Sequence, residues 1–217
     1  MSERFRIETP KGAVSAAWHD GGKRASALVV AHGAGAGMDH PFIQGFCEEL
    51  AASGVSALRF NFPYLEAGRK SPGSPKDATA AVVAAVEAAT TRTGGRPVFA
   101  GGKSYGGRMA SLAAADGMPA AGLVFLGYPL HAPGRTDQVR DAHLYELTQP
   151  MLFLQGTRDP FADPDVLRGV LRTLGKRATS VPFEDAGHSF ERSRKDDPRA
   201  NAAALVPHVV AFVKEHA

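Results

Sequence analysis

The chain has 217 residues, 44% of them hydrophobic, and its 25 Lys and Arg against 22 Asp and Glu give a formal net charge of +3. This length and apolar content suffice for a full hydrophobic core, and no linker rich in Pro, Gly and Ser divides the sequence, so we expect a single domain over residues 1–217. The basic residues are scattered rather than clustered with aromatic residues, which argues against a nucleic-acid-binding protein.

The first residues, Met-Ser-Glu-Arg-Phe-Arg, lack the apolar run of a signal peptide, and no stretch approaches the ~20 apolar residues of a membrane span. We therefore expect a cytoplasmic protein that does not bind membranes. The single cysteine, Cys47, excludes an internal disulfide and a cysteine-based zinc site. It falls within a predicted helix, where we expect it to be buried.

Short β-rich runs alternate along the chain with alanine-rich helical segments, a pattern typical of a mostly parallel sheet with helices on both faces. We predict eight strands. They are an opening hairpin, residues 4–8 and 14–18, followed by six buried strands at 27–31, 55–60, 98–101, 123–126, 151–155 and 178–183.

Helical segments fit between these strands. Two helix starts combine an acid with a proline, which suits an N-cap and a first turn: Asp39 before Pro41, and Asp163 before Pro164. The predicted helices span residues 41–52, 77–91, 107–116, 165–174 and 200–215, with a shorter helical piece near 138–147.

The fifth predicted strand runs directly into Gly-Lys-Ser-Tyr-Gly, a G-x-S-x-G turn centred on Ser104 and followed by a predicted helix. A tight strand-to-helix turn exposes the central hydroxyl, and Gly102 and Gly106 let the strand and the helix approach without Cβ clashes. We interpret Ser104 as a candidate nucleophile.

A serine hydroxyl is a weak nucleophile near neutral pH, so covalent catalysis needs a base and a group that orients the base. Asp159 follows the strand at 151–155, and His188 follows the strand at 178–183. All three candidates therefore come after strands whose carboxyl ends share one sheet edge, in the order Ser, Asp, His. We predict a catalytic triad of Ser104, Asp159 and His188.

Other residues compete for two of these roles. Asp163 and Asp165 lie in the loop of Asp159, but we expect Asp163 to cap a helix and Asp165 to lie within it. Among the remaining histidines, we expect His32 to form structural hydrogen bonds, and we expect surface or helix-end positions for four others: His19, His143, His208 and His216. These expectations favour Asp159 as the acid and His188 as the base.

An oxyanion formed by attack of Ser104 on a carbonyl needs two backbone donors. The N–H group of Tyr105 is one candidate. The glycine-rich loop after residues 27–31, His-Gly-Ala-Gly-Ala-Gly, brings the second to the same edge, with Ala34 as our choice and Gly33 as the near alternative.

Loops after two further strands are expected to border Ser104 on opposite sides. Lys103 and Arg158, beside the nucleophile and the acid, either favour an anionic substrate or form surface charges and salt bridges. The candidate pocket residues from these loops are Asn61, Phe62, Tyr64, Tyr128 and His131.

Together these features resemble an α/β-hydrolase over essentially the whole chain. Within that superfamily, four segments resemble a small capless group related to dienelactone hydrolases, which also holds a testis-expressed hydrolase-like protein and the hydrolase-like third subunit of the NSL chromatin complex. Dienelactone hydrolases have cysteine where this chain has Ser104, which points instead to ester or related acyl substrates. The segments are residues 32–41, 102–108, 127–134 and 156–161.

We therefore predict an eight-stranded α/β-hydrolase without a cap domain, since residues 127–150 are too few to form one. The predicted function is hydrolysis of small esters, thioesters or lactones through an acyl-enzyme. No metal-ligand spacing or dinucleotide-binding fingerprint is present in the sequence, so we expect no cofactor and a small acyl molecule as partner. The alternative is a catalytically silent hydrolase-like scaffold that binds a ligand or a partner. The sequence does not determine the oligomeric state.

Overall fold

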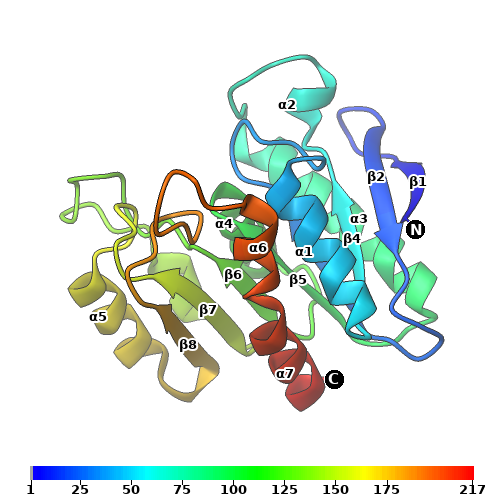
Figure 1. Ribbon diagram of the computed structural model, residues 1–217. Helices are drawn as coiled ribbons and strands as arrows, with labels where there is room; N and C mark the ends of the chain where they lie inside the picture. The colour runs from blue at the N-terminus through cyan, green and yellow to red at the C-terminus, as the bar shows by residue number, and fades with distance from the viewer. Residues whose placement is uncertain (1) are drawn as a thin grey trace.

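Eight strands form one sheet in the order β1-β2-β4-β3-β5-β6-β7-β8 in the computed structural model, which describes residues 2–217 (Figure 1). β2 pairs antiparallel with β1 and with β4, and every other neighbouring pair is parallel. The strands are β1 (Ser2–Ile7), β2 (Val14–His19), β3 (Ala27–Ala31), β4 (Ser56–Phe60), β5 (Val98–Lys103), β6 (Leu123–Leu126), β7 (Met151–Gly156) and β8 (Ala178–Phe183).

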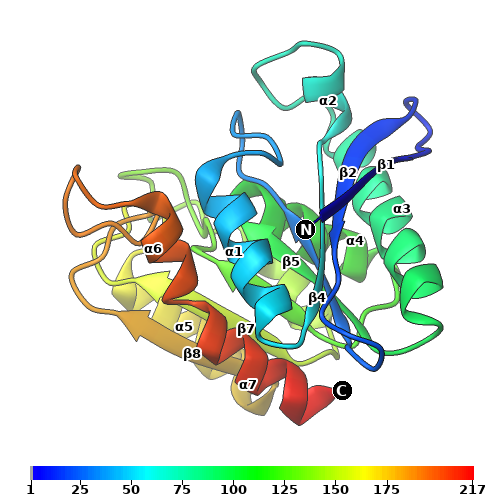
Figure 2. The same ribbon diagram turned by 45° about the vertical axis from the view of Figure 1, so that its right-hand side comes forward.

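Helices cover both faces of this sheet (Figures 1 and 2). On one face lie α1 (Pro41–Ala52), α6 (Pro198–Ala203) and α7 (Val206–His216), and on the other lie α3 (Pro75–Thr93), α4 (Tyr105–Ala115) and α5 (Pro164–Leu174). Three short pieces complete the fold: α2 (Pro63–Glu66) and the 3₁₀ turns η1 (Ala142–Glu146) and η2 (Gly175–Arg177).

The central strands are buried on both faces because helices pack against each of them. Their side chains alternate between two apolar clusters: Phe125 and Phe153 face α3 and α4, whereas Val124 and Leu152 face α1 and α7. This arrangement fixes the carboxyl ends of β3, β5, β6, β7 and β8 at one edge of the sheet, where loops are free to carry functional side chains.

The predicted eight-stranded α/β architecture with helices on both faces is confirmed. Strands 27–31, 123–126 and 178–183 have the predicted limits, and the other strand limits differ from the prediction by at most two residues. The expectation that β8 is buried is wrong, because β8 is the last strand of the sheet and its residues are half-buried or exposed.

Two helix predictions are corrected. Residues 200–215 form two helices rather than one, because Pro207 has no N–H group with which to continue the hydrogen bonds of α6. The N-cap of α1 is His40, whose Nδ1 accepts from the Phe42 amide, while Asp39 pairs with Arg59 and Arg4. The helix α2 was not predicted, since four residues are too few for a periodic pattern.

Two other predictions hold. Asp163 caps α5 by accepting from the amides of Asp165 and Val166. Cys47 is fully buried in α1, and burial raises the pKa of its thiol to about 12. Within residues 2–217, no helix combines the length and the apolar character needed to cross a membrane.

Candidate active site

Ser104 lies between the last residue of β5 and the first residue of α4, with φ 51° and ψ −117°. A positive φ in a residue with a Cβ costs about 1–3 kcal/mol and persists only where the surroundings enforce it. Here the Ser104 amide donates to the carbonyl of Leu126, and its own carbonyl accepts from the Arg108 amide at the start of α4. The strained turn is therefore held from both sides.

The two glycines of the turn allow β3 to pass close beside it. A Cβ built on Gly102 would lie 2.0 Å from the carbonyl oxygen of Ala31, and one built on Gly106 would lie 2.3 Å from the same oxygen. Neither separation is sterically possible for a real side chain. The glycines of the G-x-S-x-G motif thus permit the turn that presents Ser104.

The structure brings Ser104, His188 and Asp159 into one hydrogen-bonded series. The Ser104 hydroxyl donates to His188 Nε2 over 2.8 Å, and His188 Nδ1 donates to Asp159 Oδ2 over 2.7 Å. The Asp159 side chain is fully buried, whereas 19% of the His188 side chain is exposed. The imidazole is consequently fixed at its inner nitrogen and open to ligands at its outer edge.

Asp159 is held by groups of its own loop and of β7. Its Oδ1 accepts from the Phe161 amide over 2.8 Å, and its Oδ2 accepts from Nε2 of Gln155 as well as from His188. The Oε1 of Gln155 in turn accepts from the Tyr128 amide over 2.8 Å. Gln155 therefore links the loop after β6 to the carboxylate that orients the imidazole.

The supporting role of Gln155 has a signal in the sequence. This glutamine is the polar end of an otherwise apolar strand, Met-Leu-Phe-Leu-Gln, four residues before Asp159. A polar side chain at the carboxyl end of a buried strand requires a hydrogen-bond partner near the functional edge. Such a position marks a supporting residue even without a motif.

The loop after β3 approaches Ser104 from the opposite side. His32 is fully buried; its Nδ1 donates to the Gly33 carbonyl over 2.7 Å, and its Nε2 accepts from the Phe62 amide over 3.2 Å. Burial lowers the pKa of His32 to about 4, so the imidazole is neutral near pH 7. As expected from the sequence, His32 has a structural role.

Backbone donors are available where the sequence analysis placed them. Ala34 lines the same pocket as Ser104, and Tyr105 is the first residue of α4. Within residues 2–217, the amides of Gly33, Ala34 and Tyr105 donate no hydrogen bond, so Gly33 and Ala34 both remain candidates, whereas the Gly35 amide donates to the Tyr64 hydroxyl over 2.9 Å. The free amides suit recognition of a developing negative charge.

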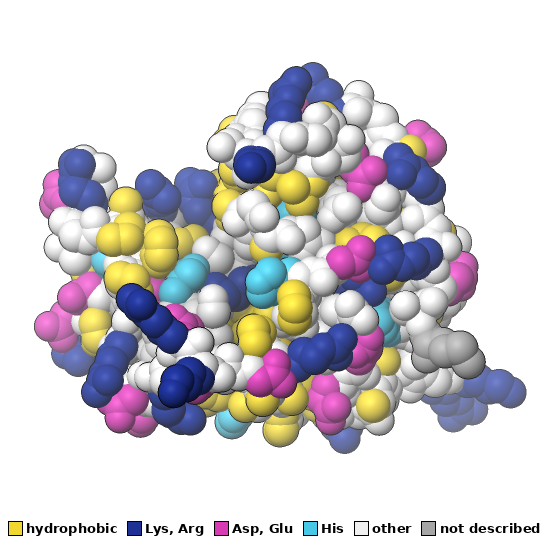
Figure 3. Space-filling view, turned by 45° about the horizontal axis from the view of Figure 1, so that its top comes forward, with side chains coloured by type: hydrophobic (Ala, Val, Ile, Leu, Met, Phe, Trp, Pro, Cys, Tyr) yellow, Lys and Arg dark blue, Asp and Glu magenta, His cyan; other side chains and the backbone are white. Residues whose placement is uncertain are grey.

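A pocket of about 320 Å³ opens over Ser104 and His188. Its walls come from the loop after β3, the first turn of α1 and the loops after β7 and β8; besides Ser104 and His188 they comprise Gly33, Ala34, Ala36, His40, Phe42, Ile43, Lys103, Phe161 and Ser189. Figure 3 views this edge of the molecule, where histidine and basic side chains lie together in a hollow bordered by hydrophobic ones.

None of the five predicted pocket residues lines this pocket. Asn61 and Tyr64 instead support the loop after β3, since Asn61 Oδ1 accepts from the Met38 amide over 2.8 Å and the Tyr64 hydroxyl accepts from Gly35. Phe62 is fully buried, with its ring centroid 4.8 Å from that of His32. These three residues lie behind the loop after β3 rather than at the pocket surface.

The two candidates from the loop after β6 are also buried. The Tyr128 hydroxyl lies 3.0 Å from Ser111 Oγ and 3.1 Å from His143 Nε2, and His131 Nε2 accepts from the Asp163 amide over 2.8 Å. Both side chains therefore point into the protein. The pocket walls come instead from the loop after β3, from α1 and from the loops after β7 and β8.

Other expectations from the sequence have mixed outcomes. Arg158 is exposed and pairs with Asp185, as expected for a surface charge. Lys103 is buried in the pocket wall, so for this residue the expectation of a surface charge or salt bridge is wrong. The expectation of a surface or helix-end position is wrong for His19, which is buried in β2 and accepts from Arg59, and His143 is half-buried and bonds to Ser111.

No cluster of three or more His, Cys, Asp and Glu side chains within residues 2–217 has the arrangement of a metal site. The side chains that line the pocket include two hydroxyls, two imidazoles and one lysine, beside the backbone amides of the loop after β3. Such groups support nucleophilic attack, proton transfer and stabilisation of an oxyanion.

Comparison with known proteins agrees with this geometry. A family model described as an alpha/beta hydrolase domain matches residues 24–215. Similar solved structures include a lidless α/β serine hydrolase from Xanthomonas campestris (TM-score 0.75, 20% identity, 97% of this chain and 94% of that one) and dienelactone hydrolase from Anabaena variabilis (TM-score 0.78, 17% identity, 100% and 98%).

An esterase from Pyrococcus furiosus is also similar, with a TM-score of 0.76, 15% identity, and coverage of 100% of this chain and 91% of that one. At these identities the structural likeness establishes the fold. The family match spans nearly all of the chain, and the segment 127–150 forms loops and a 3₁₀ turn without a cap domain. The protein belongs to the α/β-hydrolase superfamily.

Proposed function

We propose that the protein is a serine hydrolase that cleaves small ester, thioester or lactone substrates through an acyl-enzyme. The observation that carries this proposal is the hydrogen-bonded series from Ser104 through His188 to Asp159, with distances of 2.8 and 2.7 Å. The similar solved structures, which include proteins described as a serine hydrolase and an esterase, support a hydrolase.

In the proposed acylation step, His188 Nε2 accepts the Ser104 proton as Oγ attacks the carbonyl carbon of the substrate. The carboxylate of Asp159 stabilises the imidazolium that forms and keeps Nδ1 protonated. The amides of Ala34 and Tyr105 donate to the oxyanion. The imidazolium then protonates the leaving oxygen or sulfur, and the acyl group remains on Ser104.

Deacylation repeats these steps with water as the nucleophile. His188 takes a proton from the water, the hydroxide adds to the acyl carbonyl, and collapse of the intermediate returns the proton to Ser104. The His188 side chain is partly exposed, and residues 127–150 form no cap over the pocket, so water has direct access to the acyl group on Ser104. The proposed reaction needs no cofactor.

A fluorophosphonate probe with intact-mass detection tests the proposal. Wild-type protein is expected to gain one adduct, Ser104→Ala none, and His188→Ala and Asp159→Asn are expected to lose at least about 10³-fold in labelling rate. Ser53→Ala, which changes an exposed serine at the end of α1, is the matched control and is expected to label like wild type.

Absence of labelling in folded wild-type protein would sink the hydrolase proposal and favour the silent-scaffold alternative. Labelling at a serine other than Ser104 would also contradict it. Hydrolysis of 4-nitrophenyl acetate by wild type and its loss in Ser104→Ala would complete the assignment, because the probe reports nucleophilicity and the ester reports turnover.

A further inference from the structure

Lys103 is the last residue of β5, and its side chain lies in the wall of the pocket next to Ser104. Side chains two or four residues apart on a strand point to the same face of the sheet, so Lys103 lies on the face of Phe99. That face packs against α1. Only 7% of Lys103 is exposed. The side chain runs past the loop after β3 toward the loop after β6: a Cβ built on Gly33 would lie 3.7 Å from its Cγ, and one built on Gly127 would lie 3.5 Å from its Nζ.

The ammonium group has no partner within the described chain. Among residues 2–217, none of the ion pairs within 4.0 Å and none of the hydrogen bonds involves Lys103 Nζ. Buried charges are ordinarily paired, because removing an isolated charge from water is costly. Lys103 Nζ is nevertheless not among the side-chain atoms that are fully shut off from solvent without a partner, so solvent reaches the ammonium, and a ligand in the adjoining pocket can replace that solvent.

The acidic groups near Lys103 are already engaged elsewhere. Asp159 accepts from His188, Gln155 and Phe161, and the Glu191 carboxylate accepts from the Ser189 amide over 2.7 Å. Both carboxylates act on Lys103 only from beyond 4.0 Å. Neither group therefore occupies the position of a direct counter-ion.

The charge persists near neutral pH in spite of burial. Desolvation lowers the pKa of Lys103 to about 8, and the charges of Asp159 and Glu191 oppose this shift. At pH 7 most molecules therefore carry the ammonium. His40, which also lines the pocket, has a lowered pKa through burial and through the charge of Lys103, so it adds a neutral donor rather than an anion.

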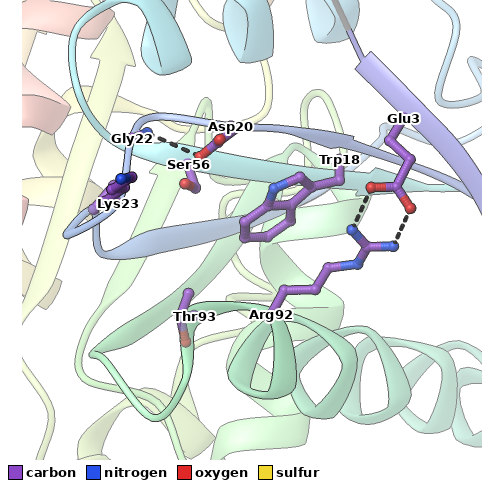
Figure 4. Close-up of a pocket in the computed structure, with 9 residues that line it drawn as sticks. Glu3, Trp18, Asp20, Gly22, Lys23, Ser56, Arg92 and Thr93 are labelled. Atoms are coloured by element: carbon purple, nitrogen blue, oxygen red, sulfur yellow. Dashed lines mark hydrogen bonds and ion pairs between the residues drawn. The ribbon is translucent and has the colours of Figure 1, made fainter.

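A second hollow of the molecule shows the contrast. It has a volume of about 380 Å³ and lies near the amino end of β4, away from the pocket of Ser104 (Figure 4). There Arg92 donates to both carboxylate oxygens of Glu3, over 2.7 and 2.8 Å, and stacks on Phe5. Its guanidinium is paired and contributes to the hairpin's attachment, whereas Lys103 is buried and unpaired.

We propose that Lys103 binds a carboxylate carried by the ester substrate, so that the enzyme selects short anionic esters over neutral ones. This inference rests on the proposed hydrolase function, since it assigns the specificity of the same pocket. A carboxylate next to the ammonium would form a charge-assisted hydrogen bond, which is stronger than a bond between neutral groups. The substrate thus supplies the counter-ion that the chain lacks.

Matched ester pairs test the proposal. In one series, 4-nitrophenyl monoesters of succinate, glutarate and adipate are compared with the butyrate, valerate and hexanoate esters, which places the anion on the acyl side. In the other, 4-acetoxybenzoate is compared with phenyl acetate, which places it on the leaving side. The readout is the ratio of kcat/KM for the acidic ester to that for its neutral counterpart.

We expect this ratio to fall by about 10- to 100-fold in Lys103→Met in at least one series, as for loss of one charge-assisted hydrogen bond. Lys103→Arg keeps the charge and is expected to retain part of the selectivity. Arg158→Met removes an exposed, paired charge beside Asp159 and is the matched control, with an unchanged ratio. Circular dichroism verifies that each variant is folded.

An equal ratio in wild type and Lys103→Met for every pair would overturn the proposal. So would a parallel loss for acidic and neutral esters, which would assign Lys103 to support of the triad. Should no ester be cleaved, the hydrolase function fails, and binding decides the inference separately: glutarate is expected to raise the Tm of Ser104→Ala but not of the double variant Ser104→Ala, Lys103→Met. No shift in either would overturn the assignment.

Discussion

The side-chain amide of Gln155 holds the acid of the proposed triad in place. It donates to the same Asp159 oxygen that accepts from His188, while its carbonyl accepts from the Tyr128 amide. Because both ends of the amide are used, the carboxylate has little freedom to rotate away from the imidazole. Gln155 is thus a positioning residue that acts through Asp159.

Gln155→Leu is expected to lower kcat about 10- to 100-fold with little change in KM, since it loosens the imidazole without touching the substrate. The measurement is steady-state hydrolysis of 4-nitrophenyl acetate. Gln44→Leu, which removes an amide bonded to Glu48 on α1, is the control and is expected to keep wild-type kcat. Equal kcat in Gln155→Leu and wild type would contradict the positioning role.

Lys103 also affects folding stability. Its pKa is 10.5 in the unfolded chain and about 8 when buried, so between these values the unfolded state binds more protons and stability rises with pH. Below pH 8 the full cost of burying the charge is present, on the order of 3–4 kcal/mol by the linkage of one pKa unit to about 1.4 kcal/mol. The cost is relieved as the pH approaches 10.5.

Lys103→Met is therefore expected to be more stable than wild type at pH 7, and the difference is expected to shrink as the pH rises from about 8 to 10. Urea unfolding of both proteins at several pH values measures it. The exposed Arg158→Met variant is expected to track wild type throughout. A difference that stays constant with pH would show that packing, not the charge, is responsible.

The proximity of Ser104, Asp159 and His188 could be predicted at this scale, because the sequence holds a G-x-S-x-G turn and an acid and a histidine after later strands. The structure brings these residues to hydrogen-bonding distance. The burial of Lys103 could not be predicted, since it depends on how closely α1 and the loop of His188 pack over β5. The separation of these segments along the sequence does not determine how closely they pack.

At the scale of elements, the turn between β5 and α4 depends on the contact with β3. A Cβ on Gly106 would lie 2.3 Å from the Ala31 carbonyl oxygen and 2.5 Å from its carbon, both in the backbone of β3, which cannot move without breaking the sheet. Overpacking of this kind is strongly destabilising.

Gly106→Ala is expected to lower the free energy of unfolding by about 3 kcal/mol or more and to abolish labelling of Ser104. Gly169→Ala is the matched control, because no atom lies within 4 Å of its built Cβ and it lies inside α5. Replacing glycine by alanine in a helix is expected to stabilise the protein by about 0.5–1 kcal/mol. Urea unfolding compares the variants, and equal stability of Gly106→Ala and wild type would contradict the packing argument.

Helix limits were less predictable than strand limits, for local reasons. The apolar pattern of residues 200–215 continues across Ala204 and Leu205, although Pro207 interrupts the backbone hydrogen bonds. At the start of α1 the acid signal was present, but buried Arg59 engages Asp39, and His40 caps the helix instead. The ion pair with Arg59 therefore keeps Asp39 from capping α1, although the local sequence favours it as the N-cap.

At the scale of the whole molecule, the alternation of β-rich and helical segments was enough to predict the sheet, because each strand needs helical cover on both faces. It was not enough to predict the pocket. The walls come from the first turn of α1 and from the loops after β7 and β8, which meet only once the sheet has twisted and the helices have packed. Strand-end positions alone therefore placed Tyr128 and His131 wrongly beside Ser104.

The size of this pocket sets an expected limit on substrate length. Its volume is about 320 Å³, at the small end of ligand sites, and residues 127–150 add no cap that could cover a longer chain. Acyl atoms that extend beyond the walls remain in water and gain no binding free energy from burial, which is worth about 0.8 kcal/mol for each methylene inside the pocket.

For neutral 4-nitrophenyl esters, kcat/KM is therefore expected to rise from acetate to about the six-carbon chain and then to level off or fall by dodecanoate. The series is measured below the critical micelle concentration of each ester. Ile43→Ala enlarges one wall and is expected to move the optimum to longer chains, while Ile7→Val, a core change distant from the pocket, is expected to leave it in place. A steady rise to dodecanoate in wild type would mean that an apolar surface outside the described pocket binds the acyl chain.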